Sequence, residues 1–409
     1  MEKFRIGVVG IRRGNIFVKL FNNTFKEYTT VPAVCETDKD LVEESRKTFL
    51  TEDIKVYENY DEFLDSGLDA VMLANFFPDH ASYAIKAMEK GIAVLSETAA
   101  APSLGECVDL VEAQERTGAK YMLAANCLYF PEVHAMKKLL ETKEYGYPMW
   151  GNAEYIHGPE GGGVVKRELD LDNLHWRQTL PTNYYNMHSL GPMMYVTGSV
   201  PKRVYCKPTV MPELSKARDV LKDNLSSIVV TEMDNGAVFH TTGCNSHSPT
   251  GKWYRLVCTE GEFETKRDWC MPRELTIVKG GYGDDYKVVR YDWVTSGVIP
   301  EEDYKKGEAE KAGHGGIDYF VGYWFIQYLL GKHKPFFDVY RSVALAATGI
   351  LGWYSALMGG VELSVPDFSK KEDRDKVRGD YRMPFAKKYS DLTLPCRMED
   401  KDKFTGYNN

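Results

Sequence analysis

The stretch that opens the chain constrains the fold more than any other part of the sequence. Residues 4–9 form an apolar run that predicts a buried strand, and residues 10–14 predict a tight turn. Residues 15–27 predict a helix, and residues 30–35 predict a second strand that ends at Glu36. In a βαβ unit of this order, turn amides and a helix N-terminus meet a pyrophosphate. The stretch therefore predicts a dinucleotide-binding unit.

The glycine pattern of this turn is incomplete. Gly10 fits the first glycine of G-x-G-x-x-G, but Arg12 and Asn15 stand where the second and third belong. Gly14 lies nearby and does not restore the spacing. Gly10, Arg12 and Arg13 are the predicted phosphate contacts. For each arginine, a solvated side chain on a loop is the alternative.

The acid at the end of the second strand indicates which nucleotide the unit binds. Glu36 is the predicted ribose contact. Its carboxylate would repel a 2′-phosphate, because the two groups carry like charge. The sequence therefore favours NAD over NADP as the cofactor.

Strand and helix patterns continue to alternate as far as residue 142. This alternation predicts an α/β fold whose N-terminal part is a Rossmann-type, doubly wound parallel sheet. Ligands of such sheets bind beyond the carboxyl ends of the strands. Those ends are predicted at Gly10, Glu36, Asn75, Glu97 and Asn126.

The pattern changes near residue 147. A predicted strand at 149–157 and a Gly-rich, charged loop at 159–174 precede a predicted helix at 182–197. Short alternating strands and turn signals then predict a mostly antiparallel, open sheet, with strands at 203–210, 225–233, 237–244, 253–258, 262–266 and 274–278. Helices predicted at 315–330 and 339–358 complete a C-terminal α+β domain.

These changes of pattern divide the chain into three parts. A length of 409 residues is enough for two domains with full hydrophobic cores. We predict a dinucleotide-binding domain at 1–146 and a substrate and oligomerisation domain at 147–368. Residues 369–409 are charged and poor in apolar periodicity, so we expect a tail that wraps the surface or is partly disordered.

Composition excludes several classes of partner. The net charge is −8 and there is no long basic run, so nucleic acid is not expected. No apolar run approaches the length of a bilayer span, so no membrane association is expected. The 8 cysteines are scattered without a Cys-x-x-Cys pair, as in a reduced, cytoplasmic protein. The histidine spacing matches no metal-ligand pattern, and we predict no metal.

Five short segments together resemble the Gfo/Idh/MocA oxidoreductase family. They occur in the family's order at residues 8–14, 34–38, 69–80, 91–97 and 126–131. The resemblance covers about residues 4–368. It implies a Rossmann domain followed by an α/β domain whose open sheet forms oligomer contacts. A carbohydrate substrate and a homo-oligomer, dimer or tetramer, are therefore expected.

Two positions depart from the family pattern. Most members carry Glu-Lys-Pro after the fourth strand, and the lysine assists proton transfer, whereas this chain has Glu97-Thr98-Ala99. Most members also place an aspartate four residues before a histidine that His188 resembles, and that position is Tyr184 here. The acid/base set of the family's dehydrogenases is therefore incomplete.

The NAD-dependent glycoside hydrolases of the family are a closer match. That branch lacks the lysine, and this chain resembles it at 97–101, 185–192, 313–318, 338–340 and 366–368. The resemblance implies a tightly held NAD that oxidises a sugar hydroxyl and is reduced again in each turnover. Between those steps, the ketone acidifies the neighbouring C–H and the glycosidic group leaves by elimination.

His188 and Tyr185 are the predicted catalytic pair. They are three residues apart on one face of a predicted helix, so both can point to one pocket. A histidine beside a phenol can take a hydroxyl proton as hydride leaves. The alternative is a histidine that caps helix contacts and a tyrosine in the core.

Other residues are predicted to contact the sugar. His314 and Asp318, four apart at a helix start, can bind hydroxyls, and the alternative is an N-terminal cap pair. Trp176 and Arg177 can supply a stacking face and a cationic fork, or they can simply pack. Further candidates are Tyr184, as pocket wall or core, and His157 and His247, which are of second rank.

The remaining cofactor contacts flank the other strand ends. Asn75 and His80 follow the third predicted strand. In relatives, the residues at the positions of Glu97 and Asn126 lie by the nicotinamide, although Glu97 could instead be a structural acid. Thr98 could hold a hydroxyl or a water, but it cannot titrate near pH 7. Proton transfer must then pass to His188 or a tyrosine.

The expected function is that of a cytoplasmic, NAD-dependent, sugar-active oxidoreductase that moves a hydride between nicotinamide and a carbohydrate hydroxyl carbon. One alternative is a redox-neutral NAD-dependent glycoside hydrolase. A second is a non-catalytic NAD-binding regulator, which the absent lysine and Tyr184 favour.

Overall fold

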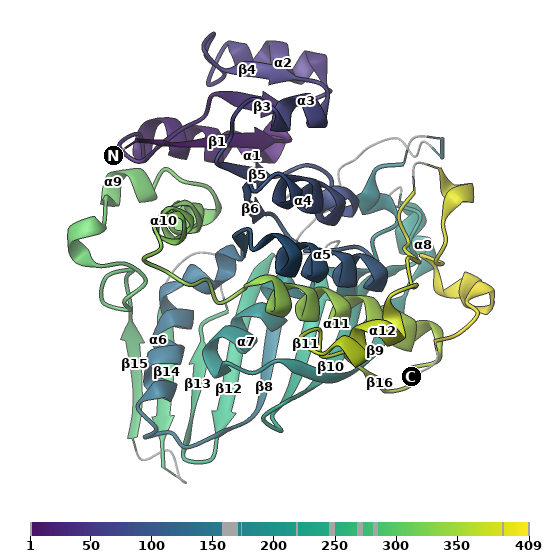
Figure 1. Cartoon of the computed structure of the whole chain (residues 1–409). Helices are drawn as coiled ribbons and strands as arrows, with labels where there is room; N and C mark the ends of the chain where they lie inside the picture. The colour runs from purple at the N-terminus through teal and green to yellow at the C-terminus, as the bar shows by residue number, and fades with distance from the viewer. Residues whose placement is uncertain are drawn as a thin grey trace. The chain divides into compact units, whose positions relative to one another are not determined.

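A computed structural model describes most of the chain (Figure 1). The described residues are 2–157, 171–172, 174–217, 220–244, 250–267, 273–280, 285–386 and 388–407. His247 and nearly all of the predicted loop at 159–174 lie outside these ranges. The chain forms two compact units: the first comprises residues 1–101, 106–126 and 301–343, and the second comprises residues 102–105, 127–300 and 344–409.

The first unit is built on a parallel sheet. Its strands run in the order β4 (Lys55–Tyr57), β3 (Ala33–Cys35), β1 (Phe4–Val9), β5 (Ala70–Leu73), β6 (Ala93–Ser96) and β7 (Tyr121–Leu123), and β2 (Thr29–Thr30) also pairs with β1. Every pairing is parallel, so the predicted doubly wound sheet is confirmed. The strand order reverses between β1 and β5, and sheets of this kind bind ligands at such a switch point.

The first unit also contains α-helices, some of which join its strands. They are α1 (Ile11–Lys19), α2 (Lys39–Arg46), α3 (Tyr60–Leu64), α4 (His80–Glu89), α5 (Leu104–Thr117), α9 (Lys306–Ala309) and α10 (Ile317–Leu329). Their ends follow local chemistry: the Asp38 side chain caps α2 and the Asn59 side chain caps α3. All four residues of β5 and of β6 are buried, as expected for central strands covered on both faces.

The first turn differs from the prediction of a turn at 10–14 and a helix at 15–27. Only Gly10 forms the turn, with φ of 77°, and α1 begins at Ile11. The helix continues past Lys19 as a π-helical turn, Leu20–Thr24. The reason is steric, because the chain can reverse within a single residue only where no side chain is present.

The second unit is built on a sheet of nine strands. Their order is β15 (Asp285–Arg290), β14 (Glu274–Lys279), β13 (Gly261–Thr265), β12 (Gly251–Cys258), β8 (Pro148–Ile156), β11 (Val238–Cys244), β10 (Asn224–Met233), β9 (Pro201–Val210) and β16 (Leu363–Ser364). Only β8 and β11 pair in parallel among these described strands, so the predicted antiparallel sheet is confirmed. β15 was not predicted, because all but one of its residues are exposed and it lacks an apolar pattern.

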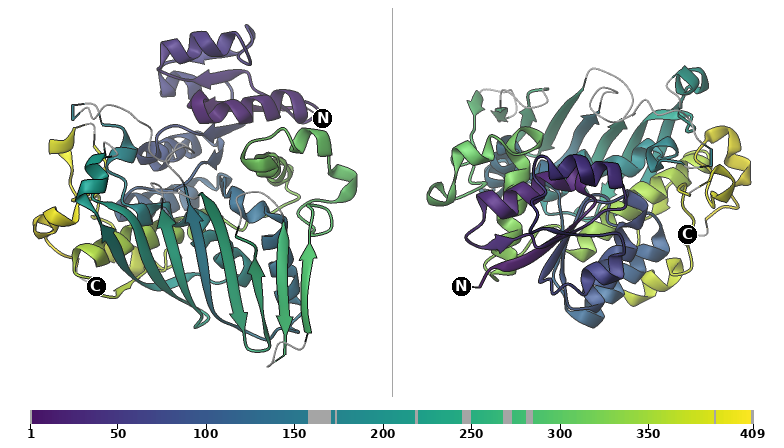
Figure 2. Two further views of the ribbon diagram at one scale, coloured as in Figure 1. Left: turned by 180° about the vertical axis from the view of Figure 1, so that it is seen from behind. Right: turned by 90° about the horizontal axis from the view of Figure 1, so that it is seen from above.

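Helices cover one face of this sheet. They include α6 (Pro131–Glu141), which contacts β14, and α7 (Leu190–Thr197), which contacts β8 and β11. Residues 344–357 of α11 (Val339–Leu357) and α12 (Lys371–Val377) belong to the same unit, and α8 (Pro212–Ala217) lies beyond one end of the strands (Figure 2). Figure 2 shows the other face, which carries no helix among the described residues. We call it the open face.

The predicted single helix at 182–197 is wrong. Residues Thr182–His188 form a 3-10 helix with a kink at Tyr185, and α7 follows from Leu190. The cause is close packing on β11, where a Cβ on Gly243 would lie 2.7 Å from the carbonyl oxygen of Thr182. The segment therefore rests on the sheet through its own backbone.

The two units differ from the linear division predicted at residue 147. Residues 301–343 group with the N-terminal sheet, and α10 packs against α1. Described tail residues are tied to the second unit: the Trp353 indole donates to the Pro395 carbonyl at 2.7 Å, and Arg382 pairs with Asp380. No helix among the described residues has the length and apolarity required to cross a bilayer.

Candidate active site

The turn after β1 leaves no room for a side chain. A Cβ on Gly10 would lie 2.6 Å from the carbonyl oxygen of Ala74, so only glycine fits. Gly14 fills a second role of the fingerprint: a Cβ there would lie 2.5 Å from the Val8 side chain, which shows that α1 packs closely on β1. The glycine spacing is irregular, but Gly10 still allows the tight turn and Gly14 still allows close packing of the helix on the strand.

The other residues at the switch point also suit a dinucleotide. Both polar atoms of the Asn75 side chain are buried without a hydrogen-bond partner, so they are available to a ligand. The Glu36 carboxylate accepts hydrogen bonds from the backbone N–H groups of Ile11, Thr37 and Asp38 at 3.0, 2.8 and 3.0 Å. These bonds fix the acid at the end of β3, beside the start of α1. The residues present therefore fit NAD.

The two arginines of the turn have different surroundings. The Arg12 side chain is 68% exposed and lies 3.5 Å from an Asp38 carboxylate oxygen. Arg13 is instead held by two acids: its Nε donates to Glu97 Oε1 at 2.8 Å, and its Nη1 and Nη2 donate to the two oxygens of Asp318 at 2.8 and 2.9 Å. Most of the Arg13 donors are therefore engaged within the protein.

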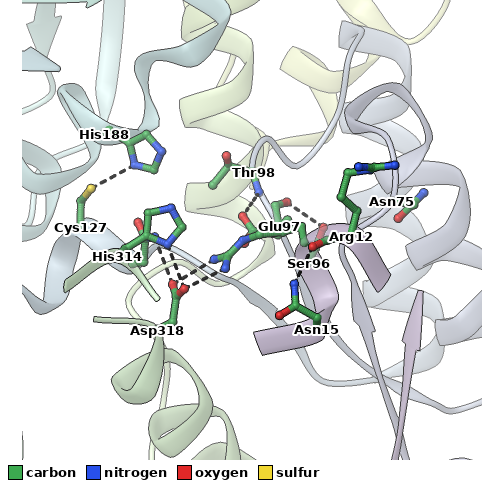
Figure 3. A network of polar contacts seen from close by, with 12 residues as sticks. Arg12, Asn15, Asn75, Ser96, Glu97, Thr98, Cys127, His188, His314 and Asp318 are labelled. Carbon is green, nitrogen blue, oxygen red and sulfur yellow. Dashed lines mark hydrogen bonds and ion pairs between the residues drawn. The ribbon is translucent and has the colours of Figure 1, made fainter. Parts of the chain in front are cut away.

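Asp318 is the centre of this network. Its side chain is 0% exposed and, besides Arg13, it binds His314 Nδ1 at 2.9 Å and Asn126 Nδ2 at 3.3 Å (Figure 3). Burial opposes ionisation, but the Arg13 charge and the His314 hydrogen bond outweigh it and hold the pKa of Asp318 well below its usual range. The carboxylate therefore stays ionised.

The segment before α10 is folded around this carboxylate. His314 has φ of 55°, a left-handed conformation that few non-glycine residues adopt, and Gly315 and Gly316 follow at 67° and 104°. A Cβ on Gly313 would lie 2.4 Å from an Asp318 carboxylate oxygen. Glycine at these positions lets the backbone fold tightly beside Asp318. The His314 side chain remains 35% exposed.

Glu97 and Thr98 lie at the end of β6. Glu97 binds Arg13 with one oxygen, and its other oxygen accepts from the Thr98 backbone N–H at 3.2 Å. Asn126 has a buried amide oxygen without a partner, because its nitrogen faces Asp318. The structure therefore brings the predicted residues Arg13, Glu97, Asn126, His314 and Asp318 together.

His80 is buried between two carbonyl groups. Its Nδ1 lies 3.0 Å from the Ala99 oxygen and its Nε2 lies 3.3 Å from the Asn75 oxygen. Burial lowers the pKa of His80, although both carbonyls favour the charged form. The ring joins the segments that follow β5 and β6, and so it supports the strand ends.

In the second unit, His188 lies in an aromatic cluster. Its ring centroid is 4.3 Å from that of Tyr155 and 5.0 Å from that of Tyr185, and its Nδ1 lies 3.0 Å from Cys127 Sγ (Figure 3). The Tyr254 hydroxyl donates to the His188 carbonyl at 2.7 Å. The predicted pair His188 and Tyr185 is thus in contact, although the predicted single helix is interrupted. The contact persists because residues three apart also align in a 3-10 helix.

Other predicted sugar contacts border this cluster. The Arg177 guanidinium lies 4.4 Å from the Trp176 ring and 5.9 Å from the Tyr185 ring, and its Nη1 is buried without a partner. The His157 ring lies 5.9 Å from that of Tyr155. Tyr184 is buried and packs edge-on against Phe385.

Three contributors to these groups were not predicted. Cys127, Tyr155 and Tyr254 surround His188, and Tyr155 and Tyr254 lie at alternate, buried positions of their strands. That alternation was the available signal, but it also fits a plain core. No group of three or more His, Cys, Asp or Glu side chains in the described part of the chain is placed to hold a metal ion.

Two regions of the chain match models of known protein families. Residues 4–125 match the family model of the oxidoreductase family with an NAD-binding Rossmann fold. Residues 301–374 match the C-terminal domain of glycosyl hydrolase 109. The NAD cofactor predicted from the sequence is thereby confirmed.

Individual relatives agree with these matches. A glycosyl hydrolase family 109 protein of Shewanella pealeana is 23% identical, over 90% of this chain and 86% of the relative. An alpha-N-acetylgalactosaminidase of Tannerella forsythia is 24% identical, over 83% of this chain and 81% of the relative.

Solved structures share the fold. Levoglucosan dehydrogenase, in complex with NADH and levoglucosan, aligns with a TM-score of 0.70 at 17% identity, over 89% of this chain and 100% of that structure. An oxidoreductase domain protein from Kribbella flavida aligns with a TM-score of 0.72 at 14% identity, over 90% of this chain and 100% of that structure. The N-terminal part of the chain thus matches the Gfo/Idh/MocA oxidoreductase family, and the chain is similar, over most of its length, to glycosyl hydrolase 109 proteins.

Proposed function

We propose that this protein is an NAD-dependent, sugar-active enzyme that transfers a hydride between nicotinamide and a carbohydrate hydroxyl carbon. One observation carries the proposal. The Gly10 turn and the network of Arg13, Glu97 and Asp318 lie at the same carboxyl edge of one parallel sheet. A nucleotide cradle and a set of ionisable groups therefore share the edge where such sheets bind their ligands.

Several side chains are suited to hold the cofactor. The amides at the start of α1 and the Gly10 turn would receive the pyrophosphate, and Glu36 would accept hydrogen bonds from a ribose. The buried amide of Asn75 provides further polar contacts, and the exposed Arg12 is free to move toward a phosphate. Bound NAD supplies a two-electron acceptor for the hydride of a sugar C–H.

The second unit is the proposed source of sugar contacts. Tyr185 and Trp176 offer aromatic faces, and sugar rings stack on such faces. The unpartnered Nη1 of Arg177 is a donor for a sugar oxygen or for the carbonyl of an acylated sugar. His188 and Tyr185 remain the proposed proton-transfer pair of this unit, with His157 at its border.

A redox-neutral glycoside cleavage is the second candidate, and the match of residues 301–374 to glycosyl hydrolase 109 favours it. In that reaction the sugar carbon is first oxidised to a ketone. The ketone acidifies the neighbouring C–H, a base removes that proton, and the glycosidic group leaves. Water then adds, and the returning hydride restores the alcohol. The absence of a lysine at Thr98 fits either reaction, provided that another group accepts the hydroxyl proton.

One experiment separates these functions. The protein is purified without added cofactor, its retained NAD is measured by absorbance after denaturation, and aryl glycosides are supplied without free NAD. Release of the aryl group under these conditions supports the redox-neutral cleavage. NADH formation that depends on both free sugar and added NAD supports a net oxidation. Binding of NAD without turnover, across a panel of sugars and N-acetylated glycosides, supports the non-catalytic alternative.

We also propose that the open face of the nine-stranded sheet mediates self-association. Large apolar side chains are exposed on its strands, among them Trp150, Tyr205 and Ile228. Exposed apolar side chains gathered on one surface are typical of protein contacts. A second copy of the chain is the occupant that the family resemblance implies.

A further inference from the structure

We infer that His314 is the group that accepts the proton of the reacting sugar hydroxyl, and that Asp318 and Arg13 position it. The inference rests on the function proposed above. In most family members a lysine assists this proton transfer, and here the inference assigns the proton of the reacting hydroxyl to His314 in place of the pair His188 and Tyr185. The evidence comes entirely from the first unit.

The orientation of His314 is the first support. Its Nδ1 faces the ionised Asp318 at 2.9 Å, so Nδ1 carries the ring proton and donates it to the carboxylate. Nε2 then has the lone pair. Within the described residues, Nδ1 is the ring atom of His314 that has a hydrogen bond, and the side chain is 35% exposed. The unprotonated nitrogen is therefore the one available to a ligand.

The charge of the network is the second support. One guanidinium, Arg13, faces two carboxylates, Glu97 and Asp318, so the group carries one net negative charge. An imidazolium at His314 would neutralise it. Proton transfer to the ring would therefore leave these four groups without net charge.

The surroundings of the network are the third support. The Asn126 amide oxygen is buried without a partner, although the Asn126 nitrogen is bound to Asp318. A buried acceptor of this kind costs free energy unless a ligand or a water satisfies it. A sugar hydroxyl is a suitable donor. The left-handed backbone at His314 also indicates a conformation retained for function, since such strain persists only where the surrounding structure imposes it.

The proposed step is balanced as follows. The sugar O–H bond breaks and its proton bonds to His314 Nε2, while the C–H bond of the same carbon breaks and its electron pair leaves with the hydride to NAD. The sugar would thereby be oxidised to a ketone, with bound NAD as the two-electron acceptor. Asp318 keeps its hydrogen bond to Nδ1–H throughout and holds the ring in place.

The test uses two substitutions that preserve the left-handed backbone. His314→Asn can adopt positive φ and can still donate to Asp318, but it cannot accept a proton. His314→Gly leaves a space that free imidazole can fill. Both variants are compared with His333→Ala, which removes a histidine of the same unit that contacts Trp324. All are assayed with the sugar that the wild type turns over, and their retained NAD is measured.

The expected result for His314→Asn is a fall in kcat of about 10²-fold to 10³-fold, with retained NAD and the thermal midpoint close to those of the wild type. Added imidazole should restore a measurable part of the activity of His314→Gly. His333→Ala should keep wild-type activity. A His314→Asn variant within threefold of the wild-type kcat would overturn the inference and leave the proposed function intact. A wild type without any turnover would instead reject the proposed function.

A second measurement does not depend on turnover. In the wild type with ¹⁵N-labelled histidine, the nitrogen signals of His314 should show the Nδ1–H tautomer, with Nε2 unprotonated. The signals are assigned by their loss in His314→Asn. In Asp318→Asn this tautomer preference should weaken. A ring that shows the Nε2–H tautomer in the wild type would contradict the orientation on which the inference rests.

Discussion

Asp318 shows how much of this molecule depends on single residues. It is a fully buried carboxylate, and it has contacts with a guanidinium, an imidazole and an amide at once. A buried charge is tolerable only when its partners satisfy it completely. Removing the charge of Asp318 would therefore affect both the stability of the first unit and the orientation of His314.

The first prediction concerns the pH dependence of stability. The pKa of Asp318 is held below its unfolded value of about 4. A depressed carboxyl pKa contributes stability above the unfolded pKa, and this contribution is lost as the pH falls toward the folded pKa. Asp318→Asn should therefore destabilise the protein at pH 7 by about 3 kcal/mol, because it breaks a buried ion pair. Urea unfolding measures the loss.

The difference between the two proteins should shrink below about pH 4, where the wild type loses the same contribution. Asp375→Asn serves as the control, because Asp375 pairs with Lys371 and Arg378 on an exposed surface. It should leave the unfolding midpoint nearly unchanged. Equal effects of the two substitutions at pH 7 would show that the buried network has no special role.

The second prediction concerns Gly10. Gly10→Ala places a Cβ 2.6 Å from the Ala74 oxygen and also imposes positive φ on a residue with a side chain. Gly67→Ala is the matched control, since Gly67 has φ of 76° and nothing lies within 4 Å of its Cβ position. Both should lose about 1–2 kcal/mol from backbone strain. Only Gly10→Ala should also lose retained NAD, as measured by absorbance after denaturation. If both variants keep NAD equally, the close approach to Ala74 is not needed for binding.

At the scale of elements, the sequence predicts those helices and strands that depend on the order of apolar and polar residues within a short segment. Most strands of the two sheets, α10 and α11 follow from apolar runs and from alternation, and their positions agree with the structure, whereas β15 lacks such a pattern. The break between Thr182–His188 and α7 could not be predicted, because it depends on Gly243 of a distant strand. The same is true of the ion pair between Arg13 and Asp318, which are 305 residues apart in the sequence.

The candidate site follows the same rule. Strand ends placed Glu97 and Asn126 at the carboxyl edge, since the topology of a parallel sheet dictates that position. The spacing of His314 and Asp318 indicated a contact between them. Nothing in the sequence near Arg13 indicates that it pairs with two carboxylates, and its place in the turn predicts a phosphate contact instead. Charge partners require a three-dimensional structure.

The third prediction tests the packing of one element on another. Gly243→Ala would force a Cβ to within 2.7 Å of the Thr182 carbonyl oxygen and would displace the 3-10 helix that carries Tyr185 and His188. Gly251→Ala, on β12, is the control because nothing lies within 4 Å of its Cβ position. Gly243→Ala should lower the thermal midpoint and raise KM for the sugar, and Gly251→Ala should change neither. Unchanged kinetics in Gly243→Ala would show that this helix does not set the sugar site.

At the scale of the whole molecule, the open face is a surface of the nine-stranded sheet that no helix among the described residues covers (Figure 2). Residues alternate along β10, so that Val229 is buried and Ile228 is 47% exposed. Trp150 is 41% exposed on the neighbouring part of the sheet, with the Arg255 guanidinium 5.3 Å from its ring. Aromatic and arginine side chains of this kind are enriched in protein interfaces.

The fourth prediction follows from this surface. Ile228→Glu places a charge where a second copy would pack, and a charge buried without a partner opposes association. Light scattering after gel filtration should show an oligomer for the wild type and a shift toward monomer for Ile228→Glu. Val361→Glu, in the loop between α11 and β16, introduces the same charge at an exposed apolar position and should leave the assembly unchanged. A stable interface buries about 800 Å² on each partner, and an unpaired charge buried within it should weaken association. A wild type that is monomeric at micromolar concentration would exclude the open face as a stable contact between copies.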